Sequence, residues 1–126
     1  MAFILVVEDD AAVRDVLVEF LGEQCHEILA TASAAEARDT MAARSVELVI
    51  ADCVLYGEQG EALAQYAAAS GVPAILITGD RARLMAAREM GLVVLWKPFR
   101  LAELDRVIAH LLGRAGEACP GGTAND

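Results

Sequence analysis

The sequence predicts an α/β fold in which a parallel five-stranded sheet is covered by helices on both faces. Short apolar segments rich in β-branched residues alternate five times with segments of helical periodicity, the pattern of repeated βαβ units. Three of these five segments contain almost no polar residues, as expected of strands that are buried on both faces. The length of 126 residues is that of a single domain.

The five expected strands are short, and most end where polar residues begin. They cover Phe3–Val7, Glu27–Ala30, Glu47–Ala51, Ala74–Thr78 and Val93–Trp96. The second is the most weakly marked, because Ala30 and Thr31 blur its end.

A helix is expected after each strand, and the first and last helices are the clearest. The first has apolar residues at i, i+3, i+4, i+7 and i+8 and ends at Gly22: Val13, Val16, Leu17, Phe20 and Leu21. The last repeats this pattern with Leu101, Leu104, Ile108 and Leu111. Together they predict two amphipathic helices.

The three middle helices are marked by their ends more than by their faces. Ser33 and Glu36 form a capping-box pattern that opens the second helix. The third is expected near Glu61–Ala69, and the fourth over about Arg81–Met90. Both are rich in alanine, so their inner faces are poorly defined by sequence.

The chain is expected to form one domain over residues 1–113, followed by a flexible tail over residues 114–126. The tail contains Pro120-Gly121-Gly122 and has no hydrophobic periodicity. No internal repeat or second domain is visible in the sequence.

Composition excludes several classes of function. The formal net charge of −9 opposes binding to a phosphate backbone, so direct nucleic-acid binding is not expected. No apolar run approaches the roughly 18 residues of a membrane span, and the apolar N-terminus lacks the basic flank of a secretory signal. We therefore expect a cytoplasmic protein. The three cysteines lack metal-ligand or redox spacing and predict neither a zinc site nor a disulfide framework.

Polar residues gather where the expected strands end. Glu8-Asp9-Asp10 follows the first strand, Asp52 the third and Lys97-Pro98 the fifth, whereas the fourth ends on Thr78-Gly79. Ligands of open α/β sheets bind outside the carboxyl ends of the strands. The sequence therefore predicts one polar site at this edge of the sheet.

The residue types at this edge suit phosphoryl transfer with a divalent cation. Carboxylates from two adjacent strands repel one another unless a cation lies among them, and Mg²⁺ takes one or two carboxylates together with water and phosphate oxygens. Lys97 can pair with Asp52 or a phosphate oxygen, and Thr78 offers a hydroxyl donor. Asp52, the acidic residue without an acidic neighbour, is the expected nucleophile. Asp10 is expected to cap the next helix.

Over roughly residues 3–112 the chain resembles a response-regulator receiver domain of two-component signalling. The resemblance lies in Ile4–Asp10, in Asp52 with Gly60 eight residues later, and in Thr78 and Lys97-Pro98-Phe99. It implies a doubly wound (βα)5 flavodoxin-like fold with strand order 2-1-3-4-5. It also implies a cis peptide bond between Lys97 and Pro98.

The resemblance further implies the roles of the site residues. Asp52 would accept the phosphoryl group with the help of Thr78 and Lys97. The Mg²⁺ ligands would be Asp9, Asp52 and the Val54 carbonyl, with Glu8 acting through water. The phosphodonor would be a phosphohistidine of a sensor histidine kinase or of a histidine phosphotransfer protein. Activity would be limited to self-phosphorylation and slow self-dephosphorylation, and output would be contact with a downstream protein.

One family feature is absent from the sequence. Val94 stands three residues before Lys97, where the family often has an aromatic residue that reports phosphorylation. The nearby aromatic is Trp96, which strand alternation places on the same face as Val94. We expect Trp96 to be a core or interface residue.

Several alternatives remain open. The chain could be a stand-alone receiver or a receiver segment of a hybrid histidine kinase, and it could form homodimers through its fourth and fifth helices. A flavodoxin-like cofactor binder is disfavoured, because Glu8-Asp9-Asp10 would repel the FMN phosphate. A metal-dependent phosphatase would need a second acid and a substrate cap, and neither is visible in the sequence.

Overall fold

A computed structural model of the chain describes residues 2–55 and 58–113. The expected tail over residues 114–126 lies outside the described residues. The elements, in chain order, are β1 (Phe3–Val7), α1 (Ala11–Glu23), β2 (Glu27–Thr31), α2 (Ala34–Ala43), β3 (Leu48–Asp52), β4 (Val54–Leu55), β5 (Glu58–Gln59), α3 (Gly60–Ala69), β6 (Ala74–Thr78), α4 (Arg81–Glu89), β7 (Val93–Trp96) and α5 (Leu101–Leu112).

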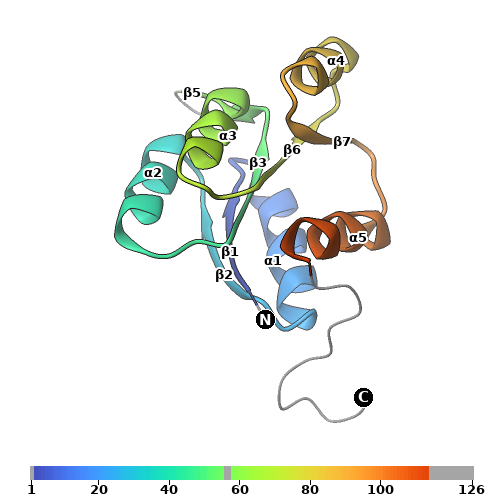
Figure 1. The fold of residues 1–126 in the computed structure, drawn as a ribbon. Helices are drawn as coiled ribbons and strands as arrows, with labels where there is room; N and C mark the ends of the chain where they lie inside the picture. The colour runs from blue at the N-terminus through green and yellow to red at the C-terminus, as the bar shows by residue number, and fades with distance from the viewer. Residues whose placement is uncertain (1, 56–57, 114–126) are drawn as a thin grey trace.

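The central sheet has five parallel strands in the order β2-β1-β3-β6-β7 (Figure 1). This order confirms the predicted doubly wound topology, since β6 and β7 are the fourth and fifth strands of the sheet. The short pair β4–β5 is antiparallel and was not predicted, because two-residue strands leave no periodicity in a sequence.

Two apolar layers hold helices against opposite faces of this sheet. Leu5 and Val7 of β1 face a layer completed by α2, α3 and α4, whereas Ile4 and Val6 face a layer completed by α1 and α5. Figure 1 shows α2 and α3 on one side of the sheet and α1 and α5 on the other. Strand alternation thus divides one buried segment between two cores.

Most helix ends follow the sequence signals, but α1 continues through Gly22, its predicted end, to Glu23. Ser33 Oγ accepts a hydrogen bond from the Glu36 amide at 3.2 Å, as the capping box predicts. In a capping box the Glu36 carboxylate would also accept a hydrogen bond from the Ser33 amide. Here it accepts one from the Thr31 hydroxyl at 2.8 Å instead. Arg100 precedes α5 and provides no side-chain cap.

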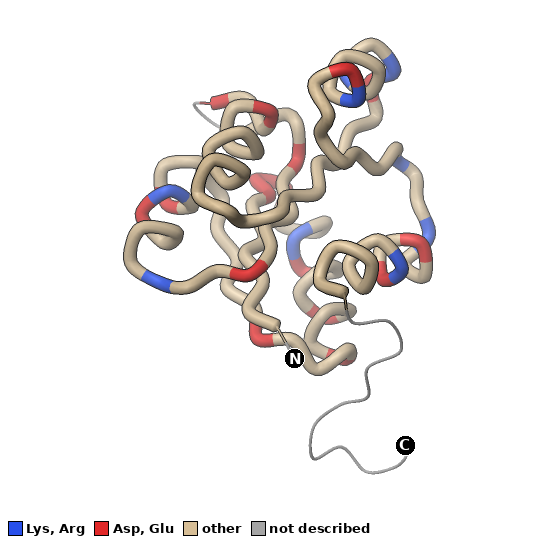
Figure 2. Tube along the Cα trace, viewed as in Figure 1, with Lys and Arg blue, Asp and Glu red and all other residues tan. Residues whose placement is uncertain are grey.

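Charged residues lie mainly on helices and loops, and the strands are largely free of them (Figure 2). None of the described helices is long and apolar enough to cross a membrane. Cys25 is disulfide-bonded, which the number and spacing of the cysteines did not predict.

Candidate functional site

The predicted polar site is built on the two central strands, β1 and β3. These strands pair in parallel with Val7 opposite Ala51, so the next residues, Glu8 and Asp52, come off adjacent strands at the same level. Asp52 is the last residue of β3, one residue later than the predicted strand end. Parallel pairing therefore brings together residues that lie far apart in the sequence.

Three carboxylates meet at this edge. Glu8, Asp9 and Asp52 each offer an oxygen, and these oxygens all lie within 4.8 Å of one another. The Glu8 side chain is buried, Asp9 is exposed and Asp52 is partly buried. Such a cluster of oxygen donors, open on one side, suits a hard divalent cation that retains some of its water.

Glu8 is the member of the cluster that most needs a positive partner. Burial raises the pKa of its carboxyl above the ordinary value, and the nearby charges of Asp52 and Asp9 raise it further. Its Oε2 accepts a hydrogen bond from the Asp10 amide at 3.2 Å. Its Oε1 is buried and has no hydrogen-bond partner among the described residues. A buried orphan oxygen beside two further carboxylates fits Mg²⁺.

Asp10 caps α1 and does not belong to the cluster. Its Oδ1 accepts from the amides of Ala12 at 2.9 Å and Val13 at 3.2 Å. The prediction that Asp10 is a helix cap is confirmed. Arg14, one turn further along α1, donates to the Glu8 carbonyl oxygen at 2.8 Å and fixes the backbone at the end of β1.

Lys97 brings a positive charge to the other side of Asp52. Its Nζ lies 3.4 Å from Asp52 Oδ1. Its amide donates to the Thr78 carbonyl at 2.8 Å, and the peptide bond to Pro98 is cis, as the family resemblance implies. The ammonium group is therefore held at the predicted nucleophile by the end of β7.

Thr78 ends β6, the strand beside β3. Asp52 pairs with Ile77, so the buried Thr78 lies one residue further toward the site. Its Oγ1 accepts a hydrogen bond from the Asp80 amide at 3.0 Å, and a threonine hydroxyl can donate a hydrogen bond as well. Asp80 in turn caps α4 through the amides of Ala82 and Arg83.

The loop after Asp52 is closed tightly by a glycine. The Gly60 amide donates to the Cys53 carbonyl at 2.9 Å. A Cβ at Gly60 would lie 2.2 Å from the Asp52 carbonyl oxygen, closer than any side chain can approach. Val54, whose carbonyl is a predicted metal ligand, follows Cys53 and exposes 58% of its surface.

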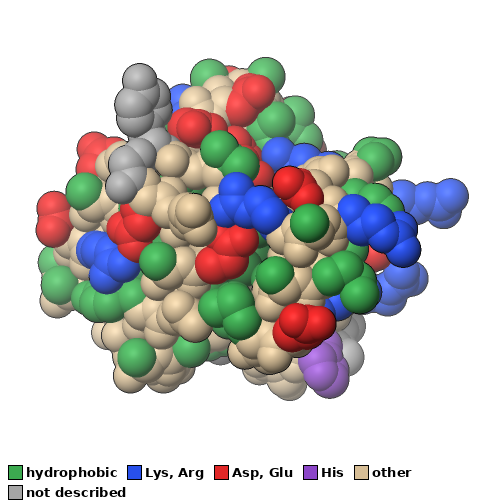
Figure 3. Space-filling model, turned by 90° about the horizontal axis from the view of Figure 1, so that it is seen from above, with side chains coloured by type: hydrophobic (Ala, Val, Ile, Leu, Met, Phe, Trp, Pro, Cys, Tyr) green, Lys and Arg blue, Asp and Glu red, His purple; other side chains and the backbone are tan. Residues whose placement is uncertain are grey.

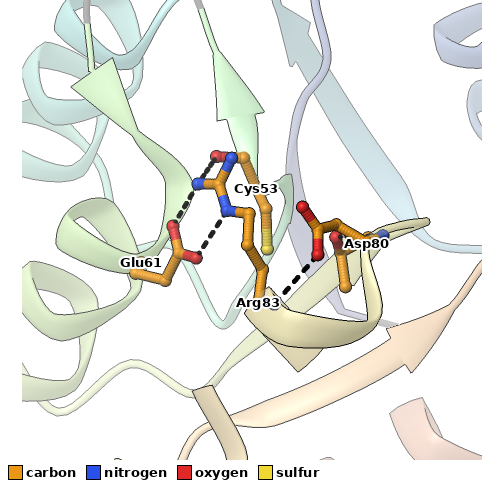
Figure 4. Close-up of polar contacts among 5 residues, drawn as sticks. Cys53, Glu61, Asp80 and Arg83 are labelled. Atoms are coloured by element: carbon orange, nitrogen blue, oxygen red, sulfur yellow. Dashed lines mark hydrogen bonds and ion pairs between the residues drawn. The ribbon is translucent and has the colours of Figure 1, made fainter. Parts of the chain in front are cut away.

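Sequence reasoning did not single out Arg83, which contacts this loop from α4. Arg83 Nη2 lies 2.6 Å from the Cys53 carbonyl oxygen, and the guanidinium also makes two bonds to Glu61 at 2.6 and 3.0 Å (Figure 4). Arg83 lies in the first turn of α4, where a positive charge is ordinarily unfavourable. This position was the signal in the sequence that Arg83 has a specific partner.

Trp96, the aromatic residue nearest to Val94, lies on the same face of the sheet as Val94, as strand alternation predicts. Val94 is buried on the face covered by α4, while Trp96 is 42% exposed. The guanidinium of Arg81, at the start of α4, lies 5.5 Å from the centre of the Trp96 ring. Trp96 is thus a surface residue that contacts α4.

The face at the carboxyl ends of the strands carries both signs of charge. Figure 3 views the molecule from above Figure 1, with most basic side chains toward the right and most acidic ones toward the left and top. Acidic and basic side chains are therefore distributed unevenly over this face.

Comparison with known proteins gives a consistent result. The family model for the response regulator receiver domain matches residues 4–109. The regulatory protein VirG of Rhizobium rhizogenes is 32% identical over 124 residues, which cover 94% of this chain and 52% of VirG. VirG of Rhizobium radiobacter is 31% identical over 111 residues, covering 87% of this chain and 34% of the relative. The chain thus spans between a third and about half of these relatives' length.

Solved structures agree with the sequence relatives. The receiver domain of the TMAO respiratory system response regulator TorR has a TM-score of 0.81 and 31% identity, with 90% of this chain and 98% of that chain covered. The signal receiver domain of an HD domain-containing protein from Pseudomonas fluorescens Pf-5 has a TM-score of 0.81 and 25% identity, with coverages of 89% and 87%.

Proposed function

Because the chain belongs to the response-regulator receiver family of two-component signalling, we propose that Asp52 accepts a phosphoryl group from a phosphohistidine. The observation that carries this proposal is the position of Asp52 itself. It ends β3 between the Lys97 ammonium, 3.4 Å away, and the carboxylates of Glu8 and Asp9. Receiver domains are signalling modules, and we assign this chain no activity beyond its own phosphorylation and slow dephosphorylation.

The proposed transfer is a displacement at phosphorus. A carboxylate oxygen of Asp52 forms the new O–P bond while the N–P bond of the phosphohistidine breaks, and the released imidazole nitrogen takes up a proton. Lys97 and the Thr78 hydroxyl stabilise charge on the transferred oxygens, since Lys97 Nζ lies 3.4 Å from Asp52 Oδ1 and Thr78 ends β6, the strand beside β3.

The carboxylate cluster would hold the cation that this reaction requires. We propose Asp9, Asp52 and the Val54 carbonyl as direct ligands of Mg²⁺, with Glu8 acting through water. Mg²⁺ bound there would neutralise the clustered carboxylates and the charge that develops on the phosphoryl oxygens. The orphan Oε1 of Glu8 supports this assignment.

The partners of the proposed reaction follow from its chemistry. The donor is a sensor histidine kinase or a histidine phosphotransfer protein, and we propose that the chain meets it in the cytoplasm. Phosphorylation adds about −1.5 to −2 charge at pH 7 and shifts the equilibrium between conformations of the domain, which a downstream protein then reads. We propose no direct contact with nucleic acid, and dimerisation through α4 and α5 is a second form that this output can take.

Acetyl phosphate tests the proposal without a cognate kinase. Incubation with acetyl phosphate and Mg²⁺ is expected to give one acid-labile adduct of about 80 Da per chain, the mass of one phosphoryl group. Asp52→Asn and removal of Mg²⁺ with EDTA should each abolish the adduct, as measured by intact mass spectrometry.

Three results would overturn the proposal. Full labelling of Asp52→Asn would place the phosphoryl group elsewhere. Continuous turnover of phosphate esters without a stoichiometric adduct would indicate a metal-dependent phosphatase instead. Retention of FMN by the purified chain would favour the flavodoxin-like alternative.

A further inference from the structure

Arg83 joins α4 to the peptide that follows the proposed phosphoacceptor. Its Nη2 donates to the Cys53 carbonyl at 2.6 Å, and that carbonyl also accepts from the Gly60 amide at 2.9 Å. Cys53 is the residue directly after Asp52, and it is fully buried. Arg83 therefore connects α4, a helix that contributes no residue to the acidic cluster, to the backbone directly after Asp52.

The guanidinium is held in place by a second partner. Glu61, in the first turn of α3, accepts from Arg83 Nε at 3.0 Å and from Nη2 at 2.6 Å, and both side chains are partly buried. A bidentate pair fixes the plane of the guanidinium, so the Nη2 hydrogen aimed at Cys53 has a set direction. In Figure 4 the guanidinium lies between the Glu61 carboxylate and the Cys53 carbonyl.

The Cys53–Val54 peptide transmits this contact to the site. A trans peptide is planar, so the direction of the Cys53 carbonyl also fixes the direction of the Val54 N–H. Val54 supplies a proposed Mg²⁺ ligand through its own carbonyl. Phosphorylation changes the charge of Asp52 and the groups that it contacts. If the Cys53–Val54 peptide rotates in response, its hydrogen bond to Arg83 must lengthen or break.

Helix α4 is thereby connected to the site by two routes. Along the chain, Thr78 binds the amide of Asp80, which caps α4. Through space, Arg83 binds Cys53. Met85 of α4 is 49% exposed and Met90, which caps the end of the helix, is 47% exposed, so movement of this helix displaces an apolar surface.

We propose that Arg83 is a positioning residue that couples the phosphoacceptor loop to α4, through its paired bonds to Glu61 and the Cys53 carbonyl. This inference rests on the proposed phosphorylation of Asp52. It assigns to this chain a route of communication that does not need an aromatic residue at position 94, where Val94 is buried in the core.

Hydrogen exchange with and without a phosphoryl mimic tests the coupling. The chain with Mg²⁺ and beryllofluoride is compared with the chain and Mg²⁺ alone, and exchange is followed by mass spectrometry in peptides that cover 81–89. Beryllofluoride occupancy is measured separately by ¹⁹F NMR. The variants are Arg83→Gln, which removes the charge and the fork, and Arg83→Lys, which keeps the charge but not the bidentate geometry.

The matched control is Arg38→Gln. Arg38 forms the same type of bidentate pair with Glu58, next to the same loop, but makes no bond to the Cys53 carbonyl. We expect the beryllofluoride-induced change in α4 exchange to fall by about twofold or more in Arg83→Gln. It should be intermediate in Arg83→Lys and unchanged in Arg38→Gln, while all variants bind beryllofluoride.

The outcomes separate this inference from the function on which it rests. Failure of the wild-type chain to bind beryllofluoride would overturn the proposed function, and the coupling with it. If the wild type binds beryllofluoride and Arg83→Gln, at equal occupancy, shows the wild-type change in α4, only the coupling is wrong. An equal loss in Arg38→Gln would also overturn it, because the effect would then come from general loosening of the loop. If Arg83→Gln does not fold, the intermediate response of Arg83→Lys decides.

Discussion

Glu8 serves the proposed function at the expense of stability. The side chain is 2% exposed, its Oε1 has no partner among the described residues, and two further carboxylates lie within 4.8 Å. Ionised Glu8 is costly in this position without a cation, because burial and like charges both oppose its charge. The same properties make it suitable for holding a divalent ion.

Replacement of Glu8 by Gln is expected to stabilise the metal-free protein. The raised pKa means that the folded state binds the Glu8 proton more tightly than the unfolded state, so wild-type stability is lost as pH rises above the ordinary value near 4.5. Gln can still accept from the Asp10 amide, and its NH₂ group can donate to the neighbouring carboxylates. We expect a gain of about 1 kcal/mol in the free energy of unfolding at pH 7.5, measured by urea denaturation in EDTA.

Two further measurements check the cause of this gain. The difference between the variant and wild type should shrink toward pH 4, where Glu8 is protonated in both states. Mg²⁺ should reverse the order at pH 7.5, because wild-type Glu8 is then paired with the ion. A pH-independent gain, or an unchanged response to Mg²⁺, would show that Glu8 does not take part in the metal site.

Position in the sequence predicted which side chains meet at the candidate site, because most of them follow or end a strand. Glu8, Asp52, Thr78 and Lys97 each follow or end a strand, and parallel pairing brings such residues to one edge. Arg83 could not be found in this way. Its partners are a backbone carbonyl in one loop and Glu61 on another helix, and helix periodicity does not encode either contact.

The segment from β3 to α3 is the element on which the site depends most closely. Within it, Gly60 approaches the Asp52 carbonyl so closely that a Cβ would lie 2.2 Å from that oxygen and 2.9 Å from the Cys53 Cα. Both of these atoms belong to the backbone and cannot move aside as a flexible side chain could. The conformation of Gly60 is ordinary, so its requirement is for space alone.

Gly60→Ala is therefore expected to destabilise the protein by about 2 kcal/mol and to weaken Mg²⁺ binding, because the clash displaces the peptide beside Asp52. Thermal unfolding monitored by circular dichroism, with a Mg²⁺ titration, measures both effects. Gly22→Ala is the control, since a Cβ there would meet only Ile28 Cδ1 at 4.0 Å. That change lies in α1 and should leave stability equal or raise it by up to about 1 kcal/mol. Equal stability of both variants would contradict the clash.

The elements themselves were largely predictable, and the exceptions have physical reasons. Apolar strands and amphipathic helices leave a period in the sequence, so the five strands of the sheet and the five helices were located to within a few residues. The pair β4–β5 was missed because its strands have two residues each. The third strand is predicted to end at Ala51, whereas the backbone of Asp52 continues the ladder opposite Ile77.

At the scale of the whole molecule, two apolar layers share one sheet. The layer with α2, α3 and α4 includes Leu63, and the layer with α1 and α5 includes Leu104, both fully buried. Alternate residues of β1 and β3 contribute to each layer, so neither layer can be lost while the other keeps its strands. This sharing predicts one cooperative unit rather than two separately stable halves.

Leu63→Ala and Leu104→Ala are each expected to lower the free energy of unfolding by about 2–5 kcal/mol, because each leaves a cavity in a different layer. Unfolding should nevertheless remain a single transition in both variants, with calorimetric and van't Hoff enthalpies that agree. Leu101→Ala, at a position that is 37% exposed on α5, is the control and should cost less than about 1 kcal/mol. Two resolved transitions in either core variant would mean that the layers unfold independently.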